Sequence, residues 1–143
     1  METLLRSSAD PSVQSWHNRT TLHRATEGTN DDVINLLVRA GVSVAPGPAV
    51  FEGPLQIAVD GKAPKAVRTL IRHGAPLDWH EGGLETPLFS AVRQPLPSVV
   101  AALPAAGSDP NLHVDEGTIL YTLFSEEIGS RFREVFSEIL RTR

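Results

Sequence analysis

Two carboxylates and two histidines are the residues of this chain best suited to chemistry. Glu27 and Asp60 are 33 residues apart, and His23 and His73 occur in the same two stretches of sequence. A carboxylate pair beside a histidine can carry out acid–base chemistry when burial shifts the pKa of one member. The sequence contains no GxSxG, no GxGxxG and no phosphate-binding glycine loop. We therefore assign no catalytic residue, and keep an acid–base enzyme or small-molecule binder using Glu27, Asp60 and His73 as the alternative function.

The histidines do not form a recognisable metal motif. His80 and His113 are 33 residues apart, which suggests equivalent positions in neighbouring structural units. Packed helices lie roughly 8–10 Å apart, so these two side chains would be near the limit for sharing one ion. The sequence has no HExxH, no evident third ligand and no cysteine. We predict no metal and no cofactor.

Composition limits the classes of partner. The chain has 143 residues, 41% of them hydrophobic, which suits one domain with a sizeable core. Its formal net charge of −4 and the lack of a basic stripe argue against nucleic acid. No stretch of apolar residues is long enough to cross a membrane, and the N-terminal residues lack the order of a signal peptide. We expect a cytoplasmic protein, with the nucleus left open.

The elements that must position these residues follow a repeat of 33 residues. A leucine, an alanine and a glycine recur together at this interval: Leu22, Leu55 and Leu88; Ala25, Ala58 and Ala91; Gly41, Gly74 and Gly107. Such a period indicates one structural unit copied along the chain, and arrays of this kind offer a continuous surface to a partner.

Each copy reads as two helices joined by a turn. In the third copy, Thr86 is a suitable N-cap and Pro87 fits the first helical position, so a helix begins there. A second apolar helix is predicted from Ser98 to Ala106, ended by Gly107. Pro104 lies inside that helix and removes one N–H donor, which predicts a bend near its end.

These units resemble the ankyrin repeat. Residues 20–25, 53–58 and 86–91 each match most or part of the signature Thr-Pro-Leu-His-x-Ala. The histidine of the signature, which hydrogen-bonds around the tight turn in the family, is kept only as His23. The resemblance implies an all-α fold: a helix-turn-helix solenoid of about four repeats with extended loops between them.

The same register predicts the domain organisation. We predict one domain over residues 1–143, made of a partial repeat 1–19, full repeats 20–52, 53–85 and 86–117, and a capping repeat 118–143 with a closing helix over 130–143. The partial repeat lacks its first helix, which leaves Leu4 and Leu5 without a neighbour. Trp16, a second copy or residues absent from this chain could cover them, so self-association through this end is one expectation.

In the ankyrin family, the loops and the groove along the first helices bind protein partners, and the resemblance implies the same here. Two aromatic residues near the loop tips are candidate anchors, and charged residues line the groove. The predicted contact set is Phe51, Glu52, Asp60, His73, Trp79, Glu85 and Arg93. The resemblance also places Glu27 and Ser125 in this mostly acidic groove, which suits a partner with basic or hydrogen-bonding groups.

Two alternatives stay open for these residues. The aromatic side chains could instead pack between adjacent loops, and the charged ones could form a solvated face. The predicted function is a protein–protein interaction module: an adaptor, inhibitor or regulatory subunit.

Overall fold

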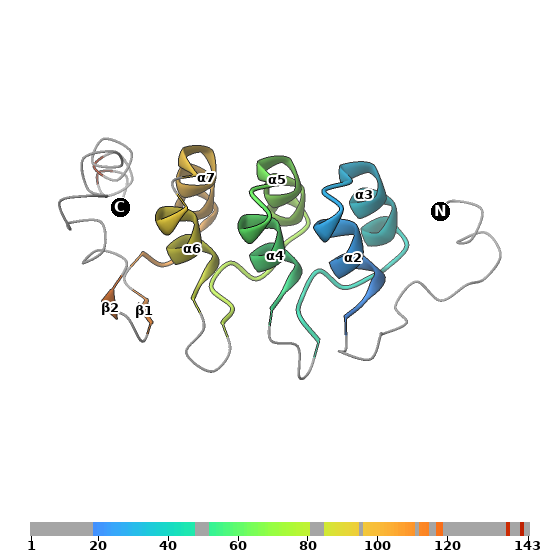
Figure 1. Cartoon of the computed structure of the whole chain (residues 1–143), viewed down its shortest axis with the longest axis horizontal. Helices are drawn as coiled ribbons and strands as arrows, with labels where there is room; N and C mark the ends of the chain where they lie inside the picture. Colours follow the sequence, from blue (N-terminus) through green and yellow to red (C-terminus); the bar gives the residue numbers. More distant parts are fainter. Residues whose placement is uncertain are drawn as a thin grey trace. The chain divides into compact units, whose positions relative to one another are not determined.

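Helix–turn–helix pairs make up most of the described chain (Figure 1). The computed structural model describes residues 19–47, 52–80, 85–94, 96–110, 112–114, 117–118, 137 and 141. The chain forms two compact units, residues 1–76 and 77–143. The single domain and its repeat boundaries stay predictions.

The first unit contains two helix pairs arranged in two layers. The pairs are α2 (Thr21–Glu27) with α3 (Asp31–Arg39), and α4 (Pro54–Asp60) with α5 (Pro64–Arg72). Helix α2 packs on α4, and α3 packs on α5, so the first helices form one layer and the second helices the other (Figure 1). The apolar face of each helix is buried between them, as the repeated Leu22 and Leu55 illustrate.

The turn inside each helix pair is closed by the same backbone hydrogen bond. The N–H groups of Asn30, Ala63 and Leu96 donate to the carbonyls of Ala25, Ala58 and Ala91, at 3.3, 2.9 and 3.0 Å. Thr29 and Lys62 stand in the first two of these turns with φ of 52° and 53°. This left-handed backbone favours glycine, so both residues are strained there.

Each second helix ends at a glycine, as the sequence predicts. Gly41, Gly74 and Gly107 have φ of 92°, 79° and 111°, a region that a residue without Cβ enters freely. The residue after each glycine donates its N–H to a leucine carbonyl five positions earlier: Val42 to Leu37, Ala75 to Leu70 and Ser108 to Leu103, at 3.1, 3.0 and 3.1 Å. The 33-residue period is therefore a period of backbone conformation.

The second unit holds α6 (Pro87–Arg93), α7 (Pro97–Ala106) and a short hairpin. Helix α6 packs on α7, and β1 (His113–Val114) pairs antiparallel with β2 (Gly117–Thr118). The two-residue strands lie in a segment predicted as an extended loop, and the predicted all-α class is confirmed. Helix α7 continues through the buried Pro104 before it ends at Gly107.

Several predictions concern residues outside the described ranges. These are the partial repeat with Leu4, Leu5 and Trp16, and most of the closing helix over 130–143, of which only Ser137 and Arg141 are described, both as helical. Among the described residues, every helix is too short or too polar to cross a bilayer.

Candidate interaction surface

The start of α2 is held by a buried histidine. The Nδ1 atom of His23 accepts hydrogen bonds from the backbone N–H of Thr20 at 3.1 Å and from its hydroxyl at 2.9 Å. Because a backbone N–H can only donate, Nδ1 carries no proton and the neutral ring has its proton on Nε2. His23 is 1% exposed, so it has the turn-stabilising position that the ankyrin resemblance implies.

Burial and a neighbouring cation keep this histidine neutral. Desolvation is the largest cause that lowers the pKa of His23 below its usual 6.5, and the Arg19 guanidinium lowers it further. The backbone carbonyl of Glu52 and the Glu27 carboxylate act in the opposite direction. The buried Nε2 lies near that carbonyl without meeting hydrogen-bond geometry, so this attraction is the weaker influence.

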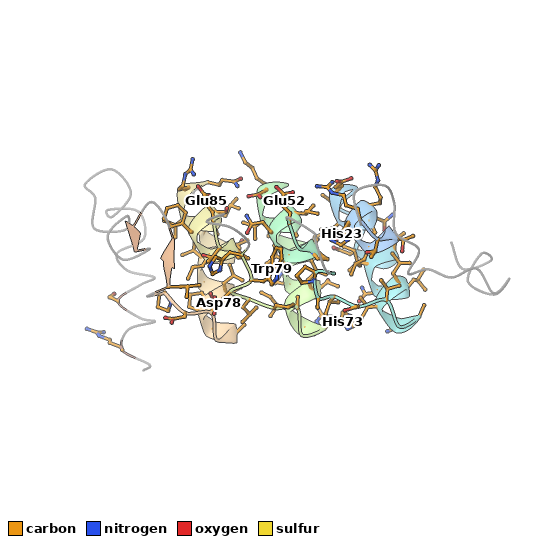
Figure 2. The ribbon with its side chains drawn as sticks, turned by 90° about the horizontal axis from the view of Figure 1, so that it is seen from below. His23, Glu52, His73, Asp78, Trp79 and Glu85 are labelled. Atoms are coloured by element: carbon orange, nitrogen blue, oxygen red, sulfur yellow. The ribbon has the colours of Figure 1, made fainter. Side chains whose placement is uncertain are left out.

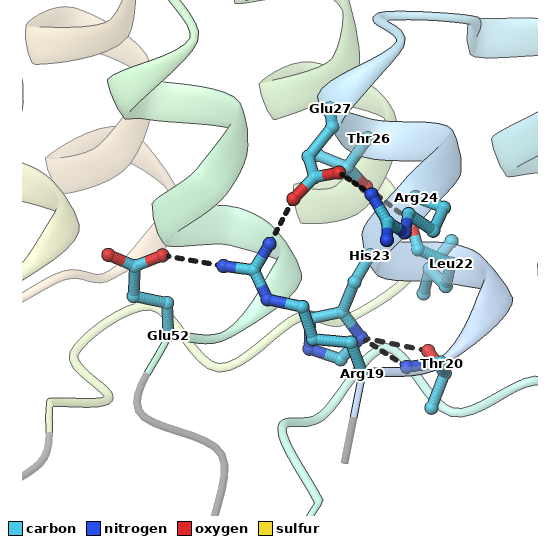
Figure 3. A network of polar contacts seen from close by, with 8 residues as sticks. All are labelled: Arg19, Thr20, Leu22, His23, Arg24, Thr26, Glu27 and Glu52. Carbon is cyan, nitrogen blue, oxygen red and sulfur yellow. Dashed lines mark hydrogen bonds and ion pairs between the residues drawn. The ribbon is translucent and has the colours of Figure 1, made fainter. Parts of the chain in front are cut away.

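An ion-pair network lies above this turn (Figure 3). The Arg19 guanidinium contacts the Glu27 carboxylate with one nitrogen and reaches Glu52 Oε2 with the other, at 3.2 Å. Arg24 contacts the second oxygen of Glu27 at 3.3 Å. Arg19 therefore connects the end of α2 to the residue that precedes α4. Because these side chains are 31–73% exposed, each pair contributes less than about 1 kcal/mol.

The second unit has a related pair with the charges exchanged. Glu85 and Arg93 form an ion pair, and the Ser90 hydroxyl donates to Glu85 Oε2 at 3.0 Å. Glu85 is in register with Arg19, and Arg93 is in register with Glu27. Both repeats thus connect the same two positions, before the first helix and at its end.

The middle repeat differs, because Glu52 and Asp60 place a carboxylate at both of these positions. Glu52 contacts Arg19 of the preceding repeat, and Asp60 accepts a hydrogen bond from Gln56 Nε2 at 2.9 Å. Two of the predicted contact residues therefore make the first-helix face of this repeat acidic.

His73 lies on the other layer. Its Nε2 donates to Asn35 Oδ1 at 3.0 Å, and Asn35 Nδ2 donates to the Asp31 carbonyl at 2.9 Å, which ties the end of α5 to α3. Figure 2 shows Glu52 and His73 at opposite sides of the first unit. The structure therefore does not bring His73 together with the Arg19–Glu27–Glu52 network, and an acid–base site built on His73 gains no geometric support.

The other predicted residues are placed as follows. Trp79 is half-buried, so a contact role and packing between loops both stay open. Phe51 and Ser125 lie outside the described residues. The exposed His80 donates from Nδ1 to the Asp78 carbonyl at 3.0 Å. In the described parts of the chain, no three acidic or histidine side chains converge as metal ligands would.

Sequence reasoning missed Asp78, which fastens two loops of the second unit. Its Oδ1 accepts from the Ser108 hydroxyl at 2.6 Å, and both carboxylate oxygens lie within 3.1 Å of the Asp109 N–H. Ser108 is fully buried. The positions in register with Asp78 are Ala45 and Asn111, so the repeat pattern carries no signal for this contact.

Helix pairs with tight turns, glycine-ended second helices and a 33-residue register define the ankyrin-repeat fold. The crystal structure of the human ASB11 ankyrin repeat domain is similar to this chain, with a TM-score of 0.80 and 20% sequence identity. The match covers 95% of this chain and 62% of that domain, so the chain spans less than two thirds of its length. No protein-family profile and no curated protein matches the chain. The ankyrin resemblance is confirmed as a fold, and this fold generally serves as a protein–protein interaction module.

Proposed function

We propose that this chain is a protein-binding module that acts as an adaptor, inhibitor or regulatory subunit. The observation that carries the proposal is the Arg19–Glu27–Glu52 network on the first-helix layer of the first unit. It holds three long side chains in place before a partner arrives. Side chains ordered in advance lose less conformational entropy on binding, which leaves more of the contact energy as affinity.

The charge of this layer suggests the chemistry of the partner. The middle repeat offers Glu52 and Asp60 where its neighbours have an arginine and a carboxylate. A lysine or arginine of a partner, placed between these two carboxylates, would complete the pairing that the adjacent repeats make internally. A basic segment of a protein is therefore the proposed partner for this surface.

Asp60→Arg tests the surface with little risk to the fold. The substitution gives the middle repeat a glutamate followed by an arginine, the arrangement of Glu85 and Arg93 in the second unit. The full chain, its Asp60→Arg variant and an Asp32→Arg control would be used to capture proteins from a lysate of the native host, with mass-spectrometric quantification. Asp32 is exposed on α3, so the control makes the same charge change on the other layer.

The expected result is a protein captured by the wild type and by Asp32→Arg, and lost with Asp60→Arg. Equal capture by all three proteins, with unchanged circular dichroism, would contradict a first-helix binding surface. Trp79→Ala tests the loop of the second unit separately, because Trp79 contributes to neither ion-pair group.

A further inference from the structure

Helix α5 presents a narrow row of basic side chains. Lys65, Arg68 and Arg72 are exposed and follow one another at positions i, i+3 and i+7. In an α-helix this spacing places them within about 60° of arc over about 10 Å. We call these three residues the α5 basic stripe. The sequence analysis expected no basic stripe, and it was wrong on this point because uncharged residues separate the three in the linear sequence.

The stripe is electrostatically unlike the other basic residues. On the first helices, Arg19, Arg24 and Arg93 are each paired with a glutamate. Within the described residues, by contrast, the three cations of the α5 basic stripe form no ion pair. This concentration of uncompensated positive charge occurs in a chain whose formal net charge is −4.

The stripe does not help α5 to fold. Lys65 stands in the first turn, where the positive end of the helix dipole disfavours a cation, while Asp31 and Asp32 occupy the first turn of α3 favourably. Like charges three or four residues apart also destabilise a helix by a few tenths of a kcal/mol per pair. A charge arrangement that works against its own helix calls for a role outside folding.

We propose that the α5 basic stripe binds a short acidic segment of a partner protein. Carboxylates spaced along one face of a partner helix, or alternating along an extended strand, can reach cations spread over about 10 Å. Ile71 is half-exposed on the same helix and would accept an apolar side chain beside those carboxylates.

The surroundings favour a short peptide over a long polyanion. The carboxylates of Asp31 and Asp32 begin α3, which packs beside α5, so negative charge borders the stripe. The net charge of the chain is also negative. Nucleic acids gain affinity by neutralising many phosphates at once, and this surface offers only three closely spaced cations.

This surface is separate from the one proposed above. The α5 basic stripe belongs to the second-helix layer, whereas the Arg19–Glu27–Glu52 network belongs to the first-helix layer. The chemistry is also opposite, because the first surface takes basic groups and the stripe takes acidic ones. Failure of one proposal would therefore leave the other standing.

Fluorescence anisotropy with a labelled polyglutamate peptide tests the stripe on the full chain. Lys65→Glu removes one attraction and adds one repulsion, so the affinity is expected to fall about tenfold. Arg141→Glu is the matched control, since it makes the same charge change at an exposed helical position outside the stripe. The control is expected to bind as the wild type does, and added salt is expected to weaken binding in both.

Thermal unfolding of the same variants separates binding from folding. Because Lys65 opposes the helix dipole, Lys65→Glu is expected to keep or raise the melting temperature while it loses the peptide. No binding by the wild type, or an equal loss with Lys65→Glu and Arg141→Glu, would overturn the proposal. So would a marked drop in the melting temperature of Lys65→Glu, or tighter binding of a short DNA duplex than of the peptide.

Discussion

Helices α2 and α6 begin with the same residue type but are stabilised differently. In α2, the N–H of Thr20 donates to the buried His23 ring, which makes the turn polar. In α6, the hydroxyl of Thr86 accepts from the N–H of Phe89 at 3.2 Å, and the Phe89 side chain is buried in the apolar core. His23 and Phe89 are in register. The same backbone turn therefore tolerates either a hydrogen-bonding or an apolar residue at this position.

The surface of these two helices shows the same freedom in its charges. Arg19 pairs with Glu27 beside α2, and Glu85 pairs with Arg93 beside α6, so the pairing is kept while the signs are exchanged. The backbone register determines where side chains meet. The charges at those meeting points vary between repeats, and they are what a partner would distinguish.

Phe89→Ala is expected to produce the largest effect and to break the equivalence of the two turns. Removing a fully buried aromatic side chain costs about 3–5 kcal/mol, because it leaves a cavity as well as losing apolar contact. The free energy of unfolding from urea denaturation measures this loss. A loss below about 1 kcal/mol would mean that Phe89 does not replace the histidine energetically.

Asp78→Ala is expected to cost about 2 kcal/mol, since it removes a charged acceptor and leaves the buried Ser108 hydroxyl without this bond. The loop of the first unit has Ala45 in register, so this contact distinguishes the two units. Asp109→Ala is a suitable control because Asp109 contributes its backbone N–H, which alanine keeps. Urea denaturation of both variants tests the assignment, and equal losses would refute it.

His23→Gln sharpens the comparison with α4, which has Gln56 at the equivalent position. At neutral pH we expect the variant to be about 1 kcal/mol less stable, the contribution of a typical buried hydrogen bond. Burial lowers the pKa of His23 below 6.5, so the unfolded chain binds the proton more strongly. The stability that neutral His23 contributes is complete above pH 6.5 and is lost as the pH falls through the lower pKa of the folded state.

The variant lacks this contribution, so the difference between the two proteins is expected to narrow below pH 6.5. Urea denaturation across this range would measure it. A constant difference would show that His23 does not lose its hydrogen bonds on protonation.

The sequence predicted local structure better than it predicted contacts. Gly41, Gly74 and Gly107 have the positive φ expected of helix-ending glycines, because that preference depends on the residue itself. The bond between Asp78 and Ser108 joins residues 30 positions apart with no counterpart in register, so no period could reveal it. The predicted groove position of His73 depended on which layer its helix end faces, and only packing determines that.

Thr29→Asn is expected to have the smallest effect and the opposite sign. Thr29 has a positive φ, which is unfavourable for a β-branched residue, and asparagine tolerates this region better. The exposed Thr29 side chain makes no hydrogen bond within the described residues, so little is lost, and we expect a gain of about 0.5–1 kcal/mol. Lys62→Asn, at the equivalent turn between α4 and α5, should gain less because lysine is not branched at Cβ. If urea denaturation showed Thr29→Asn to be destabilising while Lys62→Asn was not, the two turns would differ in more than their residue types.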